Sequence, residues 1–486
     1  MHTLLALPIE LPRRGRLQAL HGQLRGAILD GRLKAGQPLP STRGLAVSLG
    51  ISRNTVVAAY DRLLSEGYVT ARQGAAYAVA AALVVRPVTA CVASEVGDRR
   101  LAAPWRQARL PTAASSLPPV RFDLRVGVPD ASRFPFDTWR RLSARALRTL
   151  SRAPAQYDTA QGRSALRAAI AGHVSFARAV ACQADDIVVT NGAQQAFDLL
   201  ARVLVTPGHT VIAVEDPGYP PLRAAFQAAG ARVVPVPVDA EGLVVERIPR
   251  EARVIYTTPS HQFPLGMAMS PARRLALLAL AREQGALVIE DDYDGEFRYS
   301  GRPLDALQTL DRDGAVFYVG TFSKSLFPAL RLGYVVAPSW ALAAVAKARQ
   351  LSDWHGDVLA QDTLALFMAE GHLARHVRKM RRIYAERRER LLDGLARHAG
   401  MLQPLAADAG LHLAASLPPH VSAAGIVRAA LASDVRLEAL DEYVLGADAP
   451  NGLAFGLGMI PAASIDDACR RLGQVLQRLP ARTQSR

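Results

Sequence analysis

Seven short apolar runs, rich in β-branched residues, recur through the later part of the chain and constrain the fold more than any other feature. Most of them are unbroken rather than alternating, which is typical of strands covered on both faces. Stretches with helical spacing separate several of the runs. The pattern predicts a mixed, doubly wound α/β sheet of about seven strands, with a ligand site outside the carboxyl ends of the strands. The runs occupy residues 186–192, 210–216, 231–238, 252–259, 286–292, 315–321 and 332–338.

Composition divides the chain into three regions. Residues 14–80 contain short amphipathic helices and a strand pair, and residues 81–120 are rich in Ala, Pro, Ser and Arg without a sustained period, as in a linker. The strand and helix pattern fills residues 121–480. We expect a large domain at about 160–370 and a small C-terminal α/β lobe at about 371–480.

The 486-residue chain carries a formal charge of +15, which permits binding to a polyanion without requiring it. Its cysteines, Cys91, Cys182 and Cys469, are odd in number and far apart, so we expect neither a disulfide framework nor a metal site. The sequence has no apolar run of membrane-spanning length, and its N-terminus lacks the order of a secretory signal. These features predict a cytoplasmic protein.

The segment 41–79 has the pattern of a winged helix-turn-helix. Ser41 starts one short helix, a Gly-Ile turn follows, and Ser52 then caps a second helix with apolar residues at helical spacing. Residues 1–80 contain ten basic and four acidic side chains, a net charge of +6. Since recognition helices present their first turn to the major groove, we predict binding to double-stranded promoter DNA. The candidate contacts are Ser41, Arg43, Ser52, Arg53, Asn54, Thr55 and Arg72.

A protein-interaction module with solvated arginines is the alternative for this region, but the turn, the caps, the polar first turn and the wing coincide. The stretch resembles the winged helix of the GntR family of bacterial regulators through LPSTR, LGISRNTV and EGY. That resemblance implies DNA contacts by the candidates named above, except Asn54 and Arg72, which rest on the residue pattern. Where the family's wing usually reads RxGxGT, this chain has RQGAAY, so we expect weaker contact by the wing tip.

The stretch GTFSKSLFPALRLGY holds Lys324, one of only four lysines in a chain whose positive charge is almost wholly arginine. An isolated lysine is usually a surface charge, and Lys347 and Lys379 lie in arginine-rich helical stretches. Lys324 differs because it follows a predicted strand end, where a neutral amine can form a Schiff base with an aldehyde.

The neighbours of Lys324 supply what a pyridoxal 5′-phosphate (PLP) site needs. Asp291 ends a predicted strand and can hold the pyridinium nitrogen, and Tyr293 follows two residues later. The turn 191–194 opens a helix and can present amides to a phosphate, which Ser323 and Arg331 would complete. Each residue alone has an ordinary structural interpretation, but their order along successive strand ends favours the site.

This region resembles the fold type I, aspartate-aminotransferase-like PLP enzymes in NGAQQAFDLL, EDPGYP, TPSHQFPLG, EDDYDGEFRY and TFSKSLFPALRLGY. The resemblance implies a Schiff base at Lys324, a pyridinium contact at Asp291, and a ring-hydroxyl contact at Tyr293. It also implies a phosphate cup, an aromatic beside the ring, and a tyrosine that reaches the partner subunit of a homodimer. These further candidates are Gly192, Ala193, Gln194, Ser323, Arg331, Tyr219 and Tyr157.

A GntR-like head joined to such a body resembles the MocR-type regulators, which implies a PLP-dependent transcriptional regulator that senses PLP, an amine or an amino acid. A bifunctional protein with true aminotransferase activity is the alternative. Two departures favour the sensor. Phe263 stands where the enzymes commonly have a ring-supporting asparagine, which His261 or Gln262 could replace, and residues 452–458 lack the usual carboxylate-binding arginine.

Overall fold

The computed structural model describes residues 9–12, 14–71, 77–81, 100, 102, 105, 118–153, 156–301, 304–405, 407–447 and 450–478. The chain forms two compact units, residues 1–98 and 99–486, which we call the head and the body. No helix in the described part of the chain combines the length and the apolar character of a membrane span.

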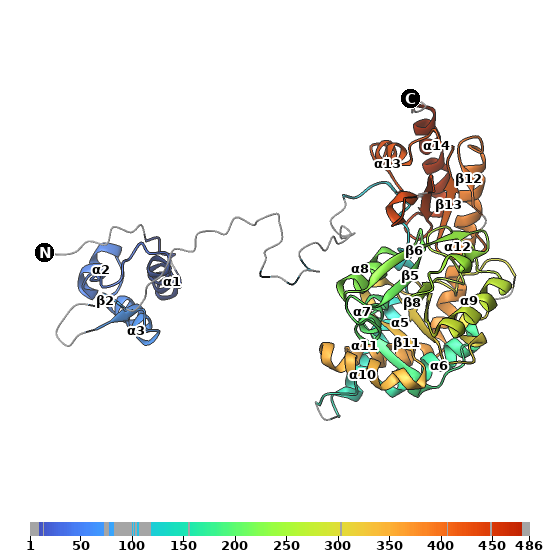
Figure 1. Cartoon of the computed structure of the whole chain (residues 1–486). Helices are drawn as coiled ribbons and strands as arrows, with labels where there is room; N and C mark the ends of the chain where they lie inside the picture. Colours follow the sequence, from blue (N-terminus) through green and yellow to red (C-terminus); the bar gives the residue numbers. More distant parts are fainter. Residues whose placement is uncertain are drawn as a thin grey trace. The chain divides into compact units, whose positions relative to one another are not determined.

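The head is the predicted winged helix-turn-helix (Figure 1). Its elements are α1 (Arg16–Leu29), α2 (Thr42–Leu49), α3 (Arg53–Ser65), β1 (Val69–Thr70) and β2 (Ala78–Val79). Both predicted caps are present, because Ser41 Oγ accepts from the amide of Gly44 at 3.0 Å and Ser52 Oγ from that of Thr55 at 3.2 Å. β1 and β2 pair antiparallel as the wing, and the loop between them, including Arg72, lies outside the described residues.

The head has its own apolar core, in which α1 and α3 pack together. Leu20 and Leu24 of α1 and Val56 and Leu63 of α3 are fully buried, as the helical spacing predicts. Tyr60 is also buried, and its hydroxyl donates to the carbonyl of Pro40 at 3.0 Å. This contact ties the start of α2 to the middle of α3.

The body is built on an eight-stranded mixed sheet of order β4-β11-β10-β9-β8-β5-β6-β7. Seven of the strands are the predicted runs, and β7 is a two-residue addition that forms a hairpin with β6 and is too short to leave an apolar run in the sequence. β6, β5, β8, β9 and β10 pair parallel, whereas β11 is antiparallel to both of its neighbours. The strands are β4 (Ile187–Thr190), β5 (Val211–Asp216), β6 (Arg232–Asp239), β7 (Gly242–Leu243), β8 (Ala252–Thr257), β9 (Leu287–Asp292), β10 (Val316–Thr321) and β11 (Gly333–Val336).

Helices cover both faces of this sheet, which explains the unbroken apolar runs. Alternate strand residues pack against α7, α8 and α10 on one face, and against α9 and the cluster that includes α6, α11 and α12 on the other. The body helices are α5 (Phe136–Leu150), α6 (Ser164–Arg178), α7 (Ala193–Leu204), α8 (Pro220–Ala228), α9 (Pro271–Gln284), α10 (Ser339–Asp353), α11 (Val358–Ala369), α12 (His372–Ala396), α13 (Ala423–Leu431) and α14 (Ala462–Arg478).

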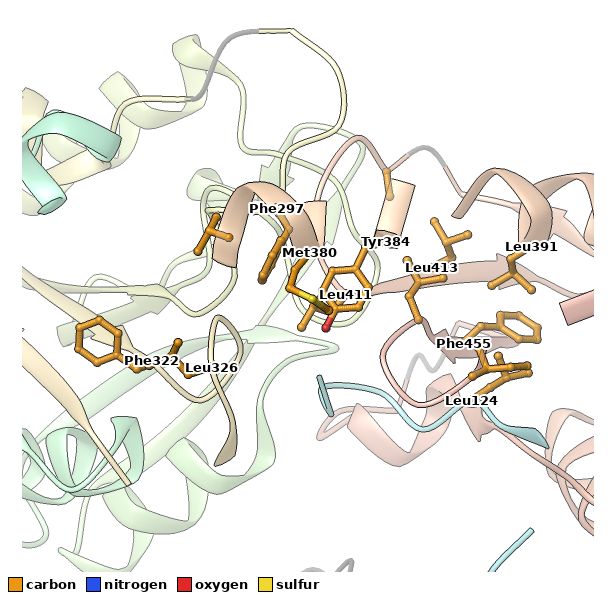
Figure 2. Packing of buried hydrophobic residues seen from close by; sticks show 14 of the residues in the cluster. Leu124, Phe297, Phe322, Leu326, Met380, Tyr384, Leu391, Leu411, Leu413 and Phe455 are labelled. Carbon is orange, nitrogen blue, oxygen red and sulfur yellow. The ribbon is translucent and has the colours of Figure 1, made fainter. Parts of the chain in front are cut away.

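A smaller lobe follows α12 and contains a four-stranded sheet of order β12-β13-β16-β15. Its strands are β12 (Gln403–Pro404), β13 (His412–Ser416), β15 (Glu438–Ala439) and β16 (Gly452–Gly456), and β14 (Val435–Arg436) pairs instead with β3 (Phe122–Asp123). One apolar cluster joins both parts of the body. Figure 2 shows it from Phe322 and Leu326, past Tyr384 of α12, to Phe455 of β16.

Candidate functional site

A cavity of about 160 Å³ lies at the carboxyl ends of the parallel strands of the body. β5, β8, β9 and β10 run in the same direction, so the residues that end or follow them meet at one edge of the sheet. Eight predicted cofactor residues line this cavity, namely Ala193, Gln194, Tyr219, Asp291, Tyr293, Ser323, Lys324 and Arg331. The fold therefore brings together side chains that are spread over 139 positions of sequence.

Lys324 follows β10, and its Nζ donates to the backbone carbonyl of Gly127 at 2.5 Å. Burial lowers the pKa of this amine, and the carboxylates of Asp294 and Asp291 oppose that effect. A lowered pKa increases the fraction of neutral amine, which is the form that attacks an aldehyde. No sequence pattern pointed to Gly127, because it lies 197 residues away from the lysine it contacts.

Asp291 lies near the end of β9, opposite Val319 of β10. Its Oδ2 accepts a hydrogen bond of 2.8 Å from the phenol of Tyr256, and its Oδ1 is buried without a partner among the described residues. Burial raises the pKa of the carboxyl to about 7. An unpartnered buried acceptor on a cavity wall fits a ligand that brings its own proton donor, such as a pyridinium nitrogen.

Arg331, which lines the cavity, lies beside Gly192, which does not line it. Arg331 adopts φ 51°, in the left-handed region, and its Nη2 donates to the carbonyl of Asn191 at 2.7 Å. Gly192 has φ 80° and precedes the first turn of α7, which begins at Ala193. A Cβ on Gly192 would approach the guanidinium to 2.7 Å, so only glycine leaves room for this arrangement. The amides of the α7 N-terminus and one arginine thus suit an anion.

Ser323 and Gln194 also line the cavity. Ser323 Oγ accepts from the hydroxyl of Thr321 at 3.0 Å, and the amide of Ser323 donates to Thr321 Oγ1 at 3.1 Å. Gln194 Nε2 donates to the carbonyl of Pro221 at 3.2 Å. These contacts fix two of the predicted phosphate residues, Ser323 just after the end of β10 and Gln194 in the first turn of α7.

Tyr219 and Phe263 form an aromatic wall, with ring centroids 5.6 Å apart at 89°. Phe263 offers no hydrogen bond to a ligand. His261 and Gln262 were the two residues predicted to replace the asparagine of the enzymes. Gln262 is directed away from the cavity, since its Nε2 donates to the carbonyls of Pro217 and Phe263. His261 lies outside the cavity lining but is 2.9 Å from the hydroxyl of Tyr293, measured from its Nδ1.

Tyr157 does not line the cavity. Its side chain is 77% exposed and packs on the exposed ring of Trp354, with centroids 4.7 Å apart. Tyr256 and Thr321 line the cavity but were missed by the sequence analysis. Both belong to predicted strands, β8 and β10, and their positions near the carboxyl ends are the signal that could have identified them.

In the head, Ser41, Arg43, Ser52, Arg53 and Asn54 are exposed around the starts of α2 and α3, and Thr55 is half-buried. The two serine hydroxyls serve as helix caps, so their side chains are already committed to backbone amides. Arg43, Arg53 and Asn54 remain exposed side chains, as the predicted DNA contact requires. Arg72 lies outside the described residues.

Two protein-family models match the chain. Residues 17–79 match bacterial regulatory proteins of the gntR family, and residues 121–445 match aminotransferase class I and II. The chain is 37% identical over 460 residues to the probable rhizopine catabolism regulatory protein MocR of Rhizobium meliloti, covering 93% of this chain and 91% of that protein. It is 34% identical to the pyridoxine biosynthesis regulator PdxR of Corynebacterium glutamicum, covering 90% of each.

Solved structures resemble the body. Kynurenine aminotransferase of Pyrococcus horikoshii matches with a TM-score of 0.72 and 27% identity, over 80% of this chain and all of that one. The α-aminoadipate aminotransferase LysN of Thermus thermophilus, solved with N-(5′-phosphopyridoxyl)-L-leucine, matches with a TM-score of 0.67 and 29% identity, over 73% and 92%. The head thus matches the gntR family model, and the body matches both the aminotransferase family model and solved aminotransferases.

Proposed function

Since the chain belongs to the MocR-type regulators of the GntR family, we propose that its body binds PLP through Lys324 and reports the state of that site to its DNA-binding head. The observation that carries the proposal is the single cavity in which Lys324, Asp291 and Arg331 meet at the carboxyl ends of the strands. The regulator acts on promoter DNA, which in a bacterium places it in the cytoplasm.

The residues of the cavity suit PLP part by part. Asp291 would hold the ring nitrogen with its unpartnered Oδ1, and Tyr293 would contact the ring hydroxyl. Arg331, Ser323 and the α7 N-terminus would hold the phosphate. When bound, PLP supplies an aldehyde carbon that reacts with primary amines. Lys324, with its lowered pKa, is the amine of this chain that is placed to occupy that carbon.

The same cavity favours sensing over efficient transamination. Among the described residues that line it, Lys324 and Arg331 are the only positive charges, and both are assigned to PLP. No second guanidinium is therefore left on the lining to clamp the carboxylate of an amino acid, which transamination needs for orientation. The ligands that fit are PLP itself or an amine that reacts with it.

A working aminotransferase is the second candidate, and the match of the body to two aminotransferases favours it. The two candidates differ in one measurement. Holoprotein incubated with panels of amino acids and keto acids should show no turnover at the rates usual for such enzymes. Turnover of any pair at those rates would establish the enzyme instead.

We further propose a homodimer in which Tyr157 of each subunit completes the phosphate site of the other. Its ring is exposed and lies outside the cavity of its own chain, and it packs on Trp354, another exposed aromatic. Exposed aromatic pairs are typical of interfaces.

The regulatory proposal is tested by titrating labelled DNA with the protein before and after loading with PLP. The DNA is the region upstream of the protein's own gene, which we call the upstream DNA. We expect specific binding that weakens steeply with salt, together with a difference in affinity or footprint between the two forms. Equal affinity for the upstream and a shuffled sequence would contradict DNA recognition. Identical binding curves and footprints for apo- and holoprotein would contradict PLP sensing.

A further inference from the structure

A buried cluster of three titratable side chains lies behind Tyr293, outside the cavity lining. His261 Nδ1 is 3.1 Å from each carboxylate oxygen of Asp294 and 2.9 Å from the hydroxyl of Tyr293. His412 packs against the ring of His261 with centroids 4.6 Å apart. All three members of the cluster, His261, Asp294 and His412, are buried.

The hydrogen-bond partners assign the ring protons of the two histidines. A carboxylate only accepts, so His261 carries its proton on Nδ1 and shares it between the carboxylate of Asp294 and the phenol oxygen of Tyr293. The hydroxyl of Tyr293 then donates to the backbone carbonyl of His261, at 3.0 Å. His412 Nε2 is 3.0 Å from the carbonyl of Pro264 and carries the proton there. The phenol of Tyr293 is therefore held from both sides by one residue, His261.

The packing argues for a hydrogen-bonded cluster rather than a metal site, although the three side chains offer ligand atoms within 4.8 Å of one another. His261 Nδ1 is already bonded to the carboxylate. A Cβ on Gly266 would lie 3.4 Å from the free Nε2, and one on Gly410 would lie 1.9 Å from Cε1 of the same ring. The backbone thus encloses the imidazole closely on both of these sides.

Asp294 is held in place independently of the histidine, because its Oδ2 also accepts from the amide of Leu411 at 3.1 Å. Its charge acts on the cavity. It opposes the lowering of the pKa of Lys324 by burial, and it helps to raise the pKa of Asp291 and of Tyr293. Among the described residues, the titratable groups that interact with Asp294 or with the groups around it are His261, His412, Lys324, Asp291, Asp292, Tyr256, Tyr293, Tyr299, Glu215 and Arg331.

Tyr293 needs this support because Phe263 stands at the position where aminotransferases commonly carry an asparagine. A phenyl ring cannot donate to or accept from the ring hydroxyl of PLP, so the phenol is left as the polar contact on that side. The phenol itself has no other hydrogen-bonding side chain than His261 among the described residues.

We propose that His261 and Asp294 are positioning residues of the PLP site, in which His261 orients the phenol of Tyr293 and Asp294 stabilises the protonated nitrogen of Lys324 when PLP is attached. The inference rests on the proposed function. A negative charge near a cationic nitrogen favours the proton, and a held phenol binds the ring hydroxyl at lower entropic cost. The two residues should therefore affect two different measurements.

The experiment uses full-length, PLP-loaded protein and follows its visible absorption band against pH. In Asp294→Asn we expect the midpoint of the titration to fall by about one pH unit, a tenfold loss of proton affinity, and in Asp294→Glu to return toward the wild-type value. Glu290→Gln is the matched control. Glu290 is a buried carboxylate of β9, the strand that precedes Asp294, and it accepts from the amides of Leu307 and Gln308, so its loss should leave the midpoint unchanged.

His261→Asn keeps the charge of Asp294 but removes the ring that orients the phenol. We expect about a tenfold weaker affinity for PLP with the midpoint unchanged. An unchanged midpoint in loaded Asp294→Asn would overturn the inference. If Asp294→Asn takes up no PLP, the PLP affinity of His261→Asn becomes the test. A wild-type PLP affinity in that variant would overturn the proposed role of His261 and Asp294. A wild-type protein without the visible band would instead refute PLP binding itself.

Discussion

The guanidinium of Arg331 occupies the space that a side chain on Gly192 would need. A Cβ built on Gly192 lies 2.7 Å from Nη2 and 2.9 Å from Cζ of Arg331. The arginine is fixed there by its hydrogen bond to the carbonyl of Asn191 and by a left-handed backbone. The glycine and the arginine are thus one unit, which presents a cation beside the first amides of α7.

Gly192→Ala should weaken PLP binding at least tenfold, because the new methyl group displaces the guanidinium and strains a backbone at φ 80°. Gly208→Ala is the control, since Gly208 has a similar φ of 78° but no atom within 4 Å of the added Cβ. It should destabilise the fold by about 1 kcal/mol and leave PLP affinity intact. Equal affinities of the two variants, measured by fluorescence titration, would refute the coupling.

Lys324→Ala should abolish covalent attachment of PLP. Treatment with borohydride and mass spectrometry should find the reduced adduct in the wild type and in Lys347→Ala, and none in Lys324→Ala. Lys347 is a suitable control because it is an exposed lysine on α10. An adduct that persists in Lys324→Ala would assign the attachment to another amine.

Asp291→Asn should stabilise the apoprotein at pH 8 by up to about 4 kcal/mol while weakening PLP binding. The folded state raises the pKa of this carboxyl from 3.8 to about 7, so it binds the proton more tightly than the unfolded chain. The resulting stability is fully present below about pH 4 and is lost as the pH rises through about 7. Urea unfolding of the apoprotein at pH 5 and pH 8 should show a smaller loss in Asp291→Asn than in the wild type. Asp137→Asn, on the exposed face of α5, should keep the wild-type dependence.

Arg53→Ala should weaken binding to the upstream DNA about tenfold, because Arg53 is an exposed side chain in the first turn of α3. Arg62→Ala removes an equal charge from the last turn of the same helix and should change the affinity less than twofold. Anisotropy titrations at two salt concentrations separate loss of charge from loss of recognition. Equal effects of the two variants would place the DNA contact elsewhere.

Two variants that each lack one residue of the PLP site should regenerate complete sites when mixed, if Tyr157 completes the site of the partner subunit. In a mixed dimer of Tyr157→Ala with Lys324→Ala, one of the two cavities has both Lys324 and the partner's Tyr157. After equal amounts of the variants are unfolded and refolded together, half of the dimers should be mixed, so we expect PLP uptake to recover to about a quarter of the wild-type value. Recovery no greater than the average of the separately refolded variants would refute a shared site.

The local features of this protein could be predicted from its sequence because they depend on neighbours along the chain. Ser41 and Ser52 cap helices that begin at the next residue, and the unbroken apolar runs became strands covered on both faces. Lys324, Asp291 and Tyr293 were identifiable because each lies at or just after the end of such a run. In the eight-stranded sheet, only β7 was missed, because a two-residue strand leaves no periodic signal.

Tertiary structure alone decided which side chains support these residues. The phenol of Tyr256 donates to Asp291, which is 35 positions away in the sequence, and the carbonyl of Gly127 accepts from Lys324, which is 197 positions away. Asp294, His261 and His412 come from three separate segments and meet in one cluster. The sequence left His261 and Gln262 as equal substitutes for an asparagine, and only the fold directed one to Tyr293 and the other to the backbone. Such contacts depend on the register of the strands and the packing of distant loops, which no local pattern encodes.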